Sequence, residues 1–161
     1  MLAGLLDSLF GIPTHAFAIH APVVLVPLGS VVAVALAVRA DWRHRVGWWL
    51  APGVAVLVGL LWFAKESGEA LRSSGNVLGD VEEHTELAEA TFVMSLVWLA
   101  AAVALVVGDR RLRSSSGAGV ATAPRDALTV TLAVVFALLA AVTTVWLVRT
   151  GHAGSRSRWV G

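Results

Sequence analysis

Four long apolar stretches dominate the sequence, at about residues 16–39, 47–66, 87–108 and 127–149. Each is long enough to cross the hydrocarbon core of a bilayer, which takes roughly 20 apolar residues in an α-helix. Hydrophobic residues make up 57% of the chain and charged residues 14%, too few polar side chains to cover a soluble globule. We therefore predict an all-α integral membrane protein, a single domain built as a bundle of four transmembrane helices.

Capping signals refine the ends of the third and fourth helices. Asp80 and Glu83 stand as an N-cap and its N3 partner, so the third helix is expected to cover about 81–108. Gly151 follows the fourth apolar stretch and is expected to be a C-cap, which would place His152 just past the helix end. Residues 110–125 are rich in Ser, Ala and Gly and are expected to form a flexible cytoplasmic linker.

The N-terminal segment carries its own apolar stripe. Its large apolar residues follow the i, i+3, i+4, i+7, i+8 spacing of one helix face: Leu2, Leu5, Leu6, Leu9 and Phe10. This pattern predicts a short amphipathic helix over about 2–11, lying in the membrane interface. The segment lacks a basic n-region and a small-x-small cleavage site, so we do not interpret it as a signal peptide.

Basic residues indicate the orientation. Seven of the twelve flank two connectors on one side: Arg39, Arg43, Arg45, Arg110, Arg111, Arg113 and Arg125. The other five lie on the opposite side: Lys65, Arg72, Arg149, Arg156 and Arg158. The positive-inside rule then predicts that both termini and the loop over 67–86 are extracytoplasmic. The preference for Arg over Lys, with abundant Ala, Val and Gly, suggests a GC-rich bacterium and hence its cytoplasmic (inner) membrane.

Several function classes are excluded by composition. Cysteine is absent, which excludes disulfides, thiolate metal sites, cysteine nucleophiles and covalently attached c-type haem. The net charge is +1 and no basic face stands apart from the helix ends, so no nucleic-acid partner is expected. The sequence shows no nucleophile–base arrangement, phosphate loop or HExxH motif, so we do not expect this chain to be an enzyme on its own.

Four of the five histidines are predicted at the same, outer end of the bundle. His15 and His20 open the first helix, His84 opens the third and His152 follows the fourth. His44 lies among arginines at the opposite end, where we expect a solvated residue of the interface. The positive potential at helix N-termini disfavours imidazolium, and the neutral imidazole is the form that binds metals.

The depth of His20 gives the strongest signal. It lies inside an apolar run, where an ionisable side chain is costly without a partner. Pro22 and Pro27 follow, and each removes a backbone N–H and frees a carbonyl one turn back, so this part of the helix is expected to be kinked. We expect one cluster at the outer end, made of His20, His84 and at least one of His15 and His152.

Such a cluster is open to three interpretations. The first is b-type haem, with two histidines as axial ligands and three basic residues near the propionates: Lys65, Arg72 and Arg149. The second is a single Cu, Zn or Fe ion, held by two or three histidines together with one of three carboxylates: Glu66, Glu69 or Glu86. The third has no cofactor, and the histidines instead hydrogen-bond to freed carbonyls and to Glu66, Glu69 or Glu89.

Motifs at both ends of the chain resemble those of a known family. Residues 15–25 read HAFAIHAPVVL, similar to the HPxxVHFPIAL-like first helix of the bacterial membrane domain-of-unknown-function family 2231. Residues 151–154 read GHAG, similar to its GHLGG-like closing motif, and His84 matches a histidine that opens the third helix. The family has no assigned reaction. Similar domains occur joined to Rieske or c-type cytochrome modules, and the resemblance therefore implies a redox setting.

These observations support one leading hypothesis and two alternatives. The leading one is a small membrane redox subunit that binds b-type haem or another metal through the outer histidines. It would pass electrons between the quinone pool and an extracytoplasmic partner, such as a Rieske, c-type cytochrome or other respiratory subunit. The first alternative is a cofactor-free accessory or assembly subunit of a respiratory complex. The second, a metal-ion transporter, is disfavoured because ionisable residues are missing across the bilayer centre.

Overall fold

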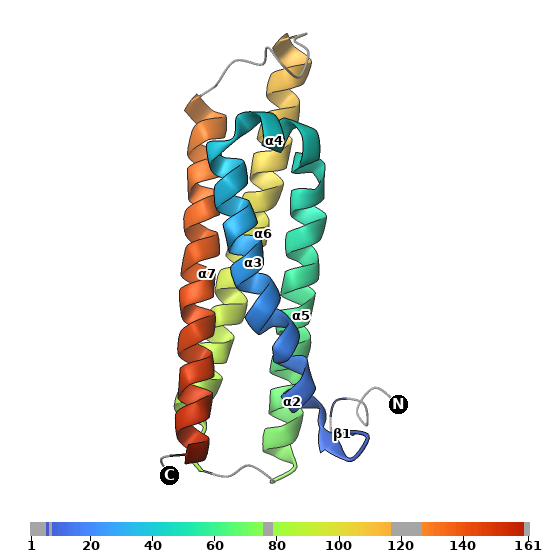
Figure 1. Ribbon diagram of the computed structural model, residues 1–161, viewed down its shortest axis with the longest axis vertical. Helices are drawn as coiled ribbons and strands as arrows, with labels where there is room; N and C mark the ends of the chain where they lie inside the picture. The colour runs from blue at the N-terminus through green and yellow to red at the C-terminus, as the bar shows by residue number, and fades with distance from the viewer. Residues whose placement is uncertain (1–5, 7, 76–78, 117–126, 160–161) are drawn as a thin grey trace.

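The structure is a computed structural model that describes residues 6, 8–75, 79–116 and 127–159 (Figure 1). In chain order the elements are β1 (Ser8–Leu9), β2 (Ile12–Pro13), α2 (Thr14–Ala18), α3 (His20–Val38), α4 (Ala40–Val46), the 3₁₀ helix η1 (Gly47–Trp49), α5 (Leu50–Ser73), α6 (Glu82–Ser116) and α7 (Ala127–Trp159). Within the described residues, four stretches are long and apolar enough to cross a membrane: Thr14–Val38, Gly47–Ser73, Glu82–Leu112 and Ala127–Ser157. The predicted all-α membrane fold is confirmed.

The four long helices form an up-and-down bundle (Figure 1). α6 packs against α7 and α5, and α3 packs against the same two helices, so the order around the bundle is α3, α5, α6, α7. α2, the ends of α5 and α7, and the start of α6 meet at one end, which we call the histidine end. α4, η1 and the end of α6 meet at the other, which we call the arginine end.

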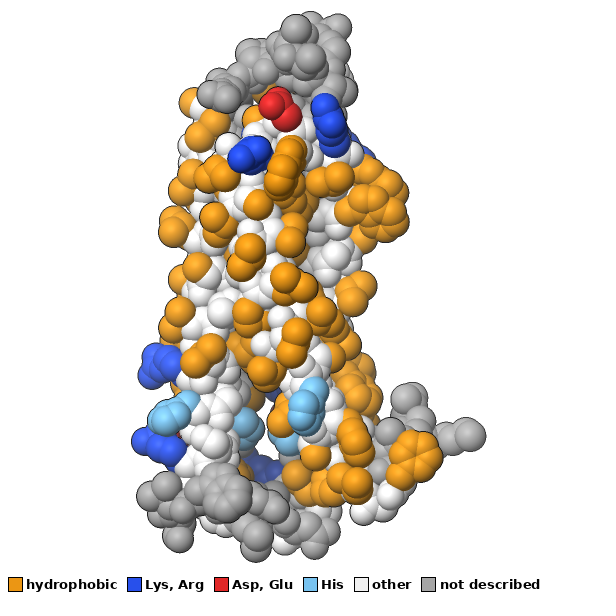
Figure 2. All heavy atoms as spheres, viewed as in Figure 1, with side chains coloured by type: hydrophobic (Ala, Val, Ile, Leu, Met, Phe, Trp, Pro, Cys, Tyr) orange, Lys and Arg blue, Asp and Glu red, His pale blue; other side chains and the backbone are white. Residues whose placement is uncertain are grey.

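The bundle axis is filled by large and small apolar side chains. Trp98 and Phe136 are fully buried at the centre, with ring centroids 5.9 Å apart. Gly29 of α3 allows close packing there, because a Cβ at this position would lie 2.8 Å from Leu57 and 3.4 Å from Trp98. The outward-facing side chains of the long helices are also largely apolar, and Figure 2 shows them along one face of the shaft. A surface of this kind fits lipid contact.

The first membrane-spanning stretch is broken after α2, as its prolines predicted. Ile19 separates α2 from α3, although its N–H still donates to His15 O at 3.2 Å and its carbonyl accepts from Val23 N at 3.2 Å. Pro22 has no N–H to donate one turn back. The chain therefore keeps a helical path while its hydrogen-bond ladder is interrupted beside His20.

The N-terminus of the third helix follows its predicted cap. Asp80 Oδ1 accepts a hydrogen bond from Glu82 N at 2.9 Å, where α6 begins. The Glu83 carboxylate does not complete a capping box, because it pairs with Arg156 of α7 at 2.6 Å. Gly79, at φ +80°, lies too close to the α7 backbone at Ser157 for any side chain to fit. The loop before α6 therefore rests against the end of α7.

The predicted ends of two helices need correction. α7 continues through Gly151 to Trp159, so Gly151 is not a C-cap and His152 lies within the helix. α6 continues to Ser116, so the first part of the linker expected over 110–125 is helical, and 117–126 lie outside the described residues. The apolar stretch sets only the minimum length of a helix that crosses a bilayer. The polar residues after the apolar stretches of α6 and α7 include no proline up to the end of each helix, so both helices continue.

The amphipathic helix expected over 2–11 is wrong for residues 8–11. Ser8 pairs with Pro13 and Leu9 with Ile12 in a short antiparallel ladder. The two turn residues, Phe10 and Gly11, have φ values of 54° and 79°, and positive φ at both central residues is typical of a tight hairpin turn. The hairpin favoured by Gly11 and Pro13 thus forms here in place of the helix that the apolar periodicity predicts. Residues 1–5 and 7 of the predicted helix lie outside the described part of the chain.

Candidate functional site

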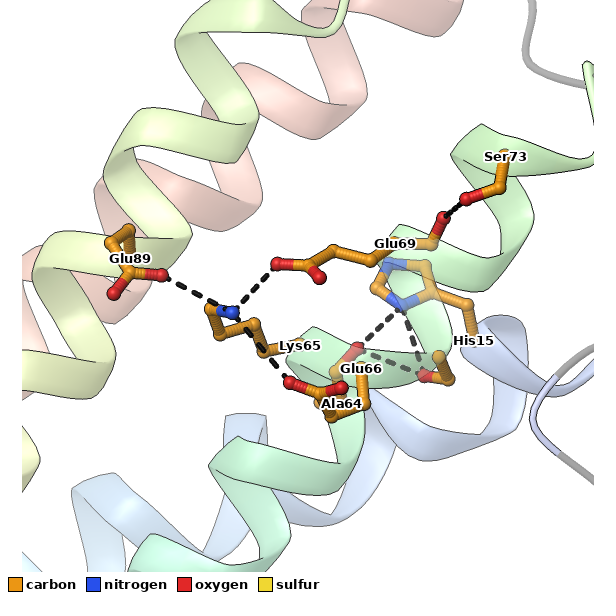
Figure 3. Close-up of polar contacts among 8 residues, drawn as sticks. His15, Ala64, Lys65, Glu66, Glu69, Ser73 and Glu89 are labelled. Carbon is orange, nitrogen blue, oxygen red and sulfur yellow. Dashed lines mark hydrogen bonds and ion pairs between the residues drawn. The ribbon is translucent and has the colours of Figure 1, made fainter. Parts of the chain in front are cut away.

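His15 is held at the histidine end by the last turns of α5. It lies on α2 and is half-buried, and its Nδ1 is 3.0 Å from Ala64 O and 3.3 Å from Ser67 Oγ (Figure 3). A carbonyl oxygen only accepts hydrogen bonds, so Nδ1 carries the proton. The ring rests on Gly68, where a Cβ would lie 3.1 Å from it. The imidazole is therefore held by the Ala64 carbonyl on one side and by the space that Gly68 leaves on another.

His84 is held in the same manner by α7. It lies in the first turn of α6, and its Nδ1 is 2.9 Å from Thr150 O. The ring rests on Gly154, where a Cβ would lie 2.8 Å from Nδ1. The Thr150 hydroxyl bonds to Thr91 Oγ1 at 2.8 Å, which fixes α7 against α6 about two turns beyond His84. Nδ1 of His84 is again the protonated nitrogen, because its partner can only accept.

The two rings meet across the bundle. Their centroids are 6.2 Å apart and their planes are inclined by 79°. His15 comes from the α2–α3 stretch and is anchored on α5, whereas His84 comes from the opposite helix, α6, and is anchored on α7. Neither Nε2 atom has a hydrogen-bond partner among the described residues. In a neutral ring whose Nδ1 is protonated, Nε2 carries the lone pair that can bind a metal.

The Nδ1 anchors are a feature that these two histidines share with metal-binding histidines. Such histidines donate their second ring N–H to a carbonyl or carboxylate, which fixes both the tautomer and the ring orientation. Metal–imidazole bonds are about 2.0–2.1 Å long, so one ion with an imidazole on either side fits a centroid separation of this size. Figure 2 shows histidine side chains gathered around a hollow at this end of the molecule. The pair is thus a candidate metal-binding site.

The structure does not bring the other predicted ligands into the pair. His20 is the first residue of α3 and its side chain is exposed. It follows the break at Ile19, and it stands five positions after His15, which turns it to a different face of the helical path. His152 is exposed on α7. Across residues 6, 8–75, 79–116 and 127–159, no three His, Asp or Glu side chains are placed to hold a metal ion.

Lys65 and Glu66, expected beside a cofactor, pair with each other, and Lys65 also pairs with two further carboxylates. Lys65 Nζ lies 2.6 Å from Glu69, 3.2 Å from Glu89 and 3.6 Å from Glu66 (Figure 3). Three carboxylates therefore surround the cation that was expected to meet a propionate. The pair between Lys65 and Glu89 links α5 to α6 beside His15.

The remaining expected polar partners also have other contacts. Arg72 pairs with Glu82 at 2.8 Å, across the loop between α5 and α6. Arg149 lies over the ring of Trp146, 4.7 Å from its centroid. Glu86 is exposed. The side chain of His44 lies outside the described atoms, although its backbone belongs to α4.

Sequence reasoning missed the groups that hold the two rings. Ala64 and Thr150 contribute backbone carbonyls, which leave no trace in a sequence. Gly68 and Gly154 contribute space. The Gly-His-Ala-Gly motif at 151–154 contains one of these positions, because its last glycine supports the His84 ring.

A buried ion pair at the arginine end was missed as well. Arg43 Nε lies 3.3 Å from both carboxylate oxygens of Asp109, and both side chains are 5% exposed. Arg43 Nη1 also donates to Leu36 O at 3.2 Å, at the end of α3. The positive-inside rule uses Arg43 only as a marker of the cytoplasmic side, whereas its contacts tie α4 to both α3 and α6.

The fold and the pair define a class, a four-helix membrane bundle with two anchored imidazoles at one end. The family model described as predicted membrane protein, DUF2231, matches residues 11–161. The chain belongs to this family, which confirms the resemblance inferred from its motifs. No curated protein and no solved structure gives a significant match.

Proposed function

We propose that the chain is a small membrane redox subunit. It binds b-type haem or a single metal ion through Nε2 of His15 and Nε2 of His84, and it passes electrons between the quinone pool and an extracytoplasmic partner. One observation carries this proposal: each imidazole is anchored through Nδ1 on a backbone carbonyl while its Nε2 has no partner among the described residues. The proposal replaces His20 by His15 as the partner of His84.

The two imidazole nitrogens limit which metals can bind at this site. Two neutral imidazoles suit Cu, Zn and Fe, whereas Mg²⁺ and Ca²⁺ prefer oxygen ligands. Facing helices of a four-helix bundle commonly supply inward-pointing ligands of this kind. Haem iron takes two axial imidazoles, and a bare ion would complete its coordination with water or with a group from the partner.

A cofactor-free accessory role is the second candidate, and the same hydrogen bonds favour it. His15 ties α2 to α5, and His84 ties α6 to α7, which locks the helix ends without any ligand. The two functions differ in the role of Nε2. An accessory protein has no use for it, whereas a metal site depends on it.

The deciding experiment is an absorption spectrum and a metal analysis of the purified full-length protein and four variants. We expect a Soret band or a stoichiometric metal in the parent protein. His15→Ala and His84→Ala should lose it, whereas His20→Ala and His152→Ala, which alter exposed histidines at the same end, should keep it. A parent without haem or metal, or full occupancy in both His15→Ala and His84→Ala, would favour the accessory role.

We also propose that the histidine end is extracytoplasmic, in the inner membrane of a bacterium. The support is the excess of Lys and Arg beside the arginine end, seven of twelve in the chain. Cysteine introduced at Ser155 should react with an impermeant reagent in intact cells, and cysteine introduced at Ser114 should not. Both residues are exposed, and the parent protein has no cysteine to interfere. Reaction at residue 114 alone would invert the orientation.

A further inference from the structure

An open groove lies between α6 and α7 at the histidine end, apart from the histidine pair. It has a volume of about 470 Å³ and is lined by Glu83, Leu87, Val148, Arg149, His152 and Arg156. This volume falls within the range of small-molecule sites, about 300–1,000 Å³. In Figure 2, basic and histidine side chains gather beside one another on this part of α7. The groove therefore combines a polar end with an apolar wall.

Its cationic side is built on one face of α7. Arg149, His152 and Arg156 follow an i, i+3, i+7 spacing, which places them in a row along the helix. The Arg149 guanidinium lies over the Trp146 ring and forms no ion pair with any described residue. Arg156 shares its charge with Glu83, at 2.6 Å. Arg149 is thus the cation of this row that remains available to an anion.

The apolar side shows which kind of anion fits. Leu87 and Val148 line the groove next to the cations, and the exposed side chains of Val145 and Val148 continue along α7 toward the bundle centre. An amphiphile with an anionic headgroup would set its charge against Arg149 and its hydrocarbon against this valine surface. Guanidinium groups bind phosphate oxygens in a bidentate manner, and a bilayer supplies such ligands at high local concentration.

We propose that this groove binds the phosphate headgroup of an anionic phospholipid. Arg149 makes the principal contact, His152 donates a ring N–H, and Arg156 adds a second guanidinium that Glu83 holds in place. The site is independent of any metal at the histidine pair, so the two proposals stand or fall separately.

The test is a thermal-unfolding titration of the full-length protein in a neutral detergent. The probes are phosphatidylglycerol, phosphatidylcholine and inorganic phosphate at matched concentrations. A ligand that binds only the folded state raises the unfolding temperature in proportion to its occupancy. We expect phosphatidylglycerol to raise it and the other two probes to leave it unchanged. An equal rise with phosphatidylcholine, or with inorganic phosphate, would overturn the assignment to an anionic lipid.

A matched pair of variants locates the effect. Arg149→Gln should weaken the apparent affinity for phosphatidylglycerol about tenfold, the size of one lost charge-assisted hydrogen bond. Arg72→Gln removes the same charge from another exposed arginine at the same end and should leave the affinity unchanged. Equal affinities for Arg149→Gln and the parent protein would show that the lipid binds elsewhere and overturn the proposal.

Discussion

The two ends of the bundle differ in how they hold polar side chains between helices. Each holds polar side chains between helices, and each anchors them on backbone carbonyls at a helix end. At the arginine end, Arg43 and Asp109 neutralise each other, and Arg43 also bonds to Leu36 O. At the histidine end, His15 and His84 each use one ring nitrogen and leave the other without a described partner.

This difference separates a structural contact from a candidate site. Buried polar groups are normally hydrogen-bonded, so a satisfied pair needs no function beyond holding helices together. A pair of partly buried imidazoles, each fixed in tautomer and orientation through Nδ1, can offer Nε2 to a ligand. Substitutions at the arginine end are therefore expected to change the free energy of unfolding, and substitutions at the histidine end to change how much cofactor is bound.

The largest effect on stability is expected at the arginine end. Asp109→Asn removes the charge opposite a buried guanidinium, which should lower the free energy of unfolding by about 3 kcal/mol. Thermal unfolding in detergent measures the loss. Asp41→Asn, at an exposed aspartate of α4, is the matched control and should cost little. Equal losses in the two variants would remove the contrast between the two ends.

A smaller effect is expected where His84 rests on α7. In Gly154→Ala the new methyl group would lie 2.8 Å from Nδ1 and should displace the ring from Thr150 O, at a cost of about 1–3 kcal/mol. Cofactor occupancy, measured as above, should fall with it. Gly151→Ala lies one turn earlier in the same helix with open space around it, and it should be neutral or slightly stabilising. Equal unfolding free energies for Gly154→Ala and Gly151→Ala would mean that the contact with Gly154 does not hold the His84 ring.

The smallest effect is expected where His15 rests on α5. In Gly68→Ala the methyl group would lie 3.1 Å from the ring, and the higher helix propensity of alanine, about 0.5–1 kcal/mol, offsets the crowding. The net change in unfolding free energy should be under about 1 kcal/mol. Gly59→Ala, in open space on the same helix, isolates the propensity gain. A loss in Gly68→Ala as large as that in Gly154→Ala would show that the two rings are held equally tightly.

The number of helices, their membrane-spanning character and the end at which four histidines gather follow from the sequence alone. Length and apolar composition decide whether a helix can span a bilayer, and short connectors decide which helix ends lie together. The start of α6 just after its cap, Asp80, was also predictable, because a cap acts within a few residues. The break near His20 was predictable for the same reason, since a proline removes a local hydrogen bond.

Which histidines meet was decided only by the tertiary structure. His20 gave the strongest sequence signal and is exposed, whereas His15 pairs with His84, 69 positions along the chain. A one-residue shift turns a side chain by about 100° around a helix, and the break at Ile19 makes its direction unreadable from spacing. The glycines and carbonyls that hold the rings, and the Asp109 partner of Arg43, act on residues distant in the sequence. Their roles depend on helix rotation and contact, which packing alone sets.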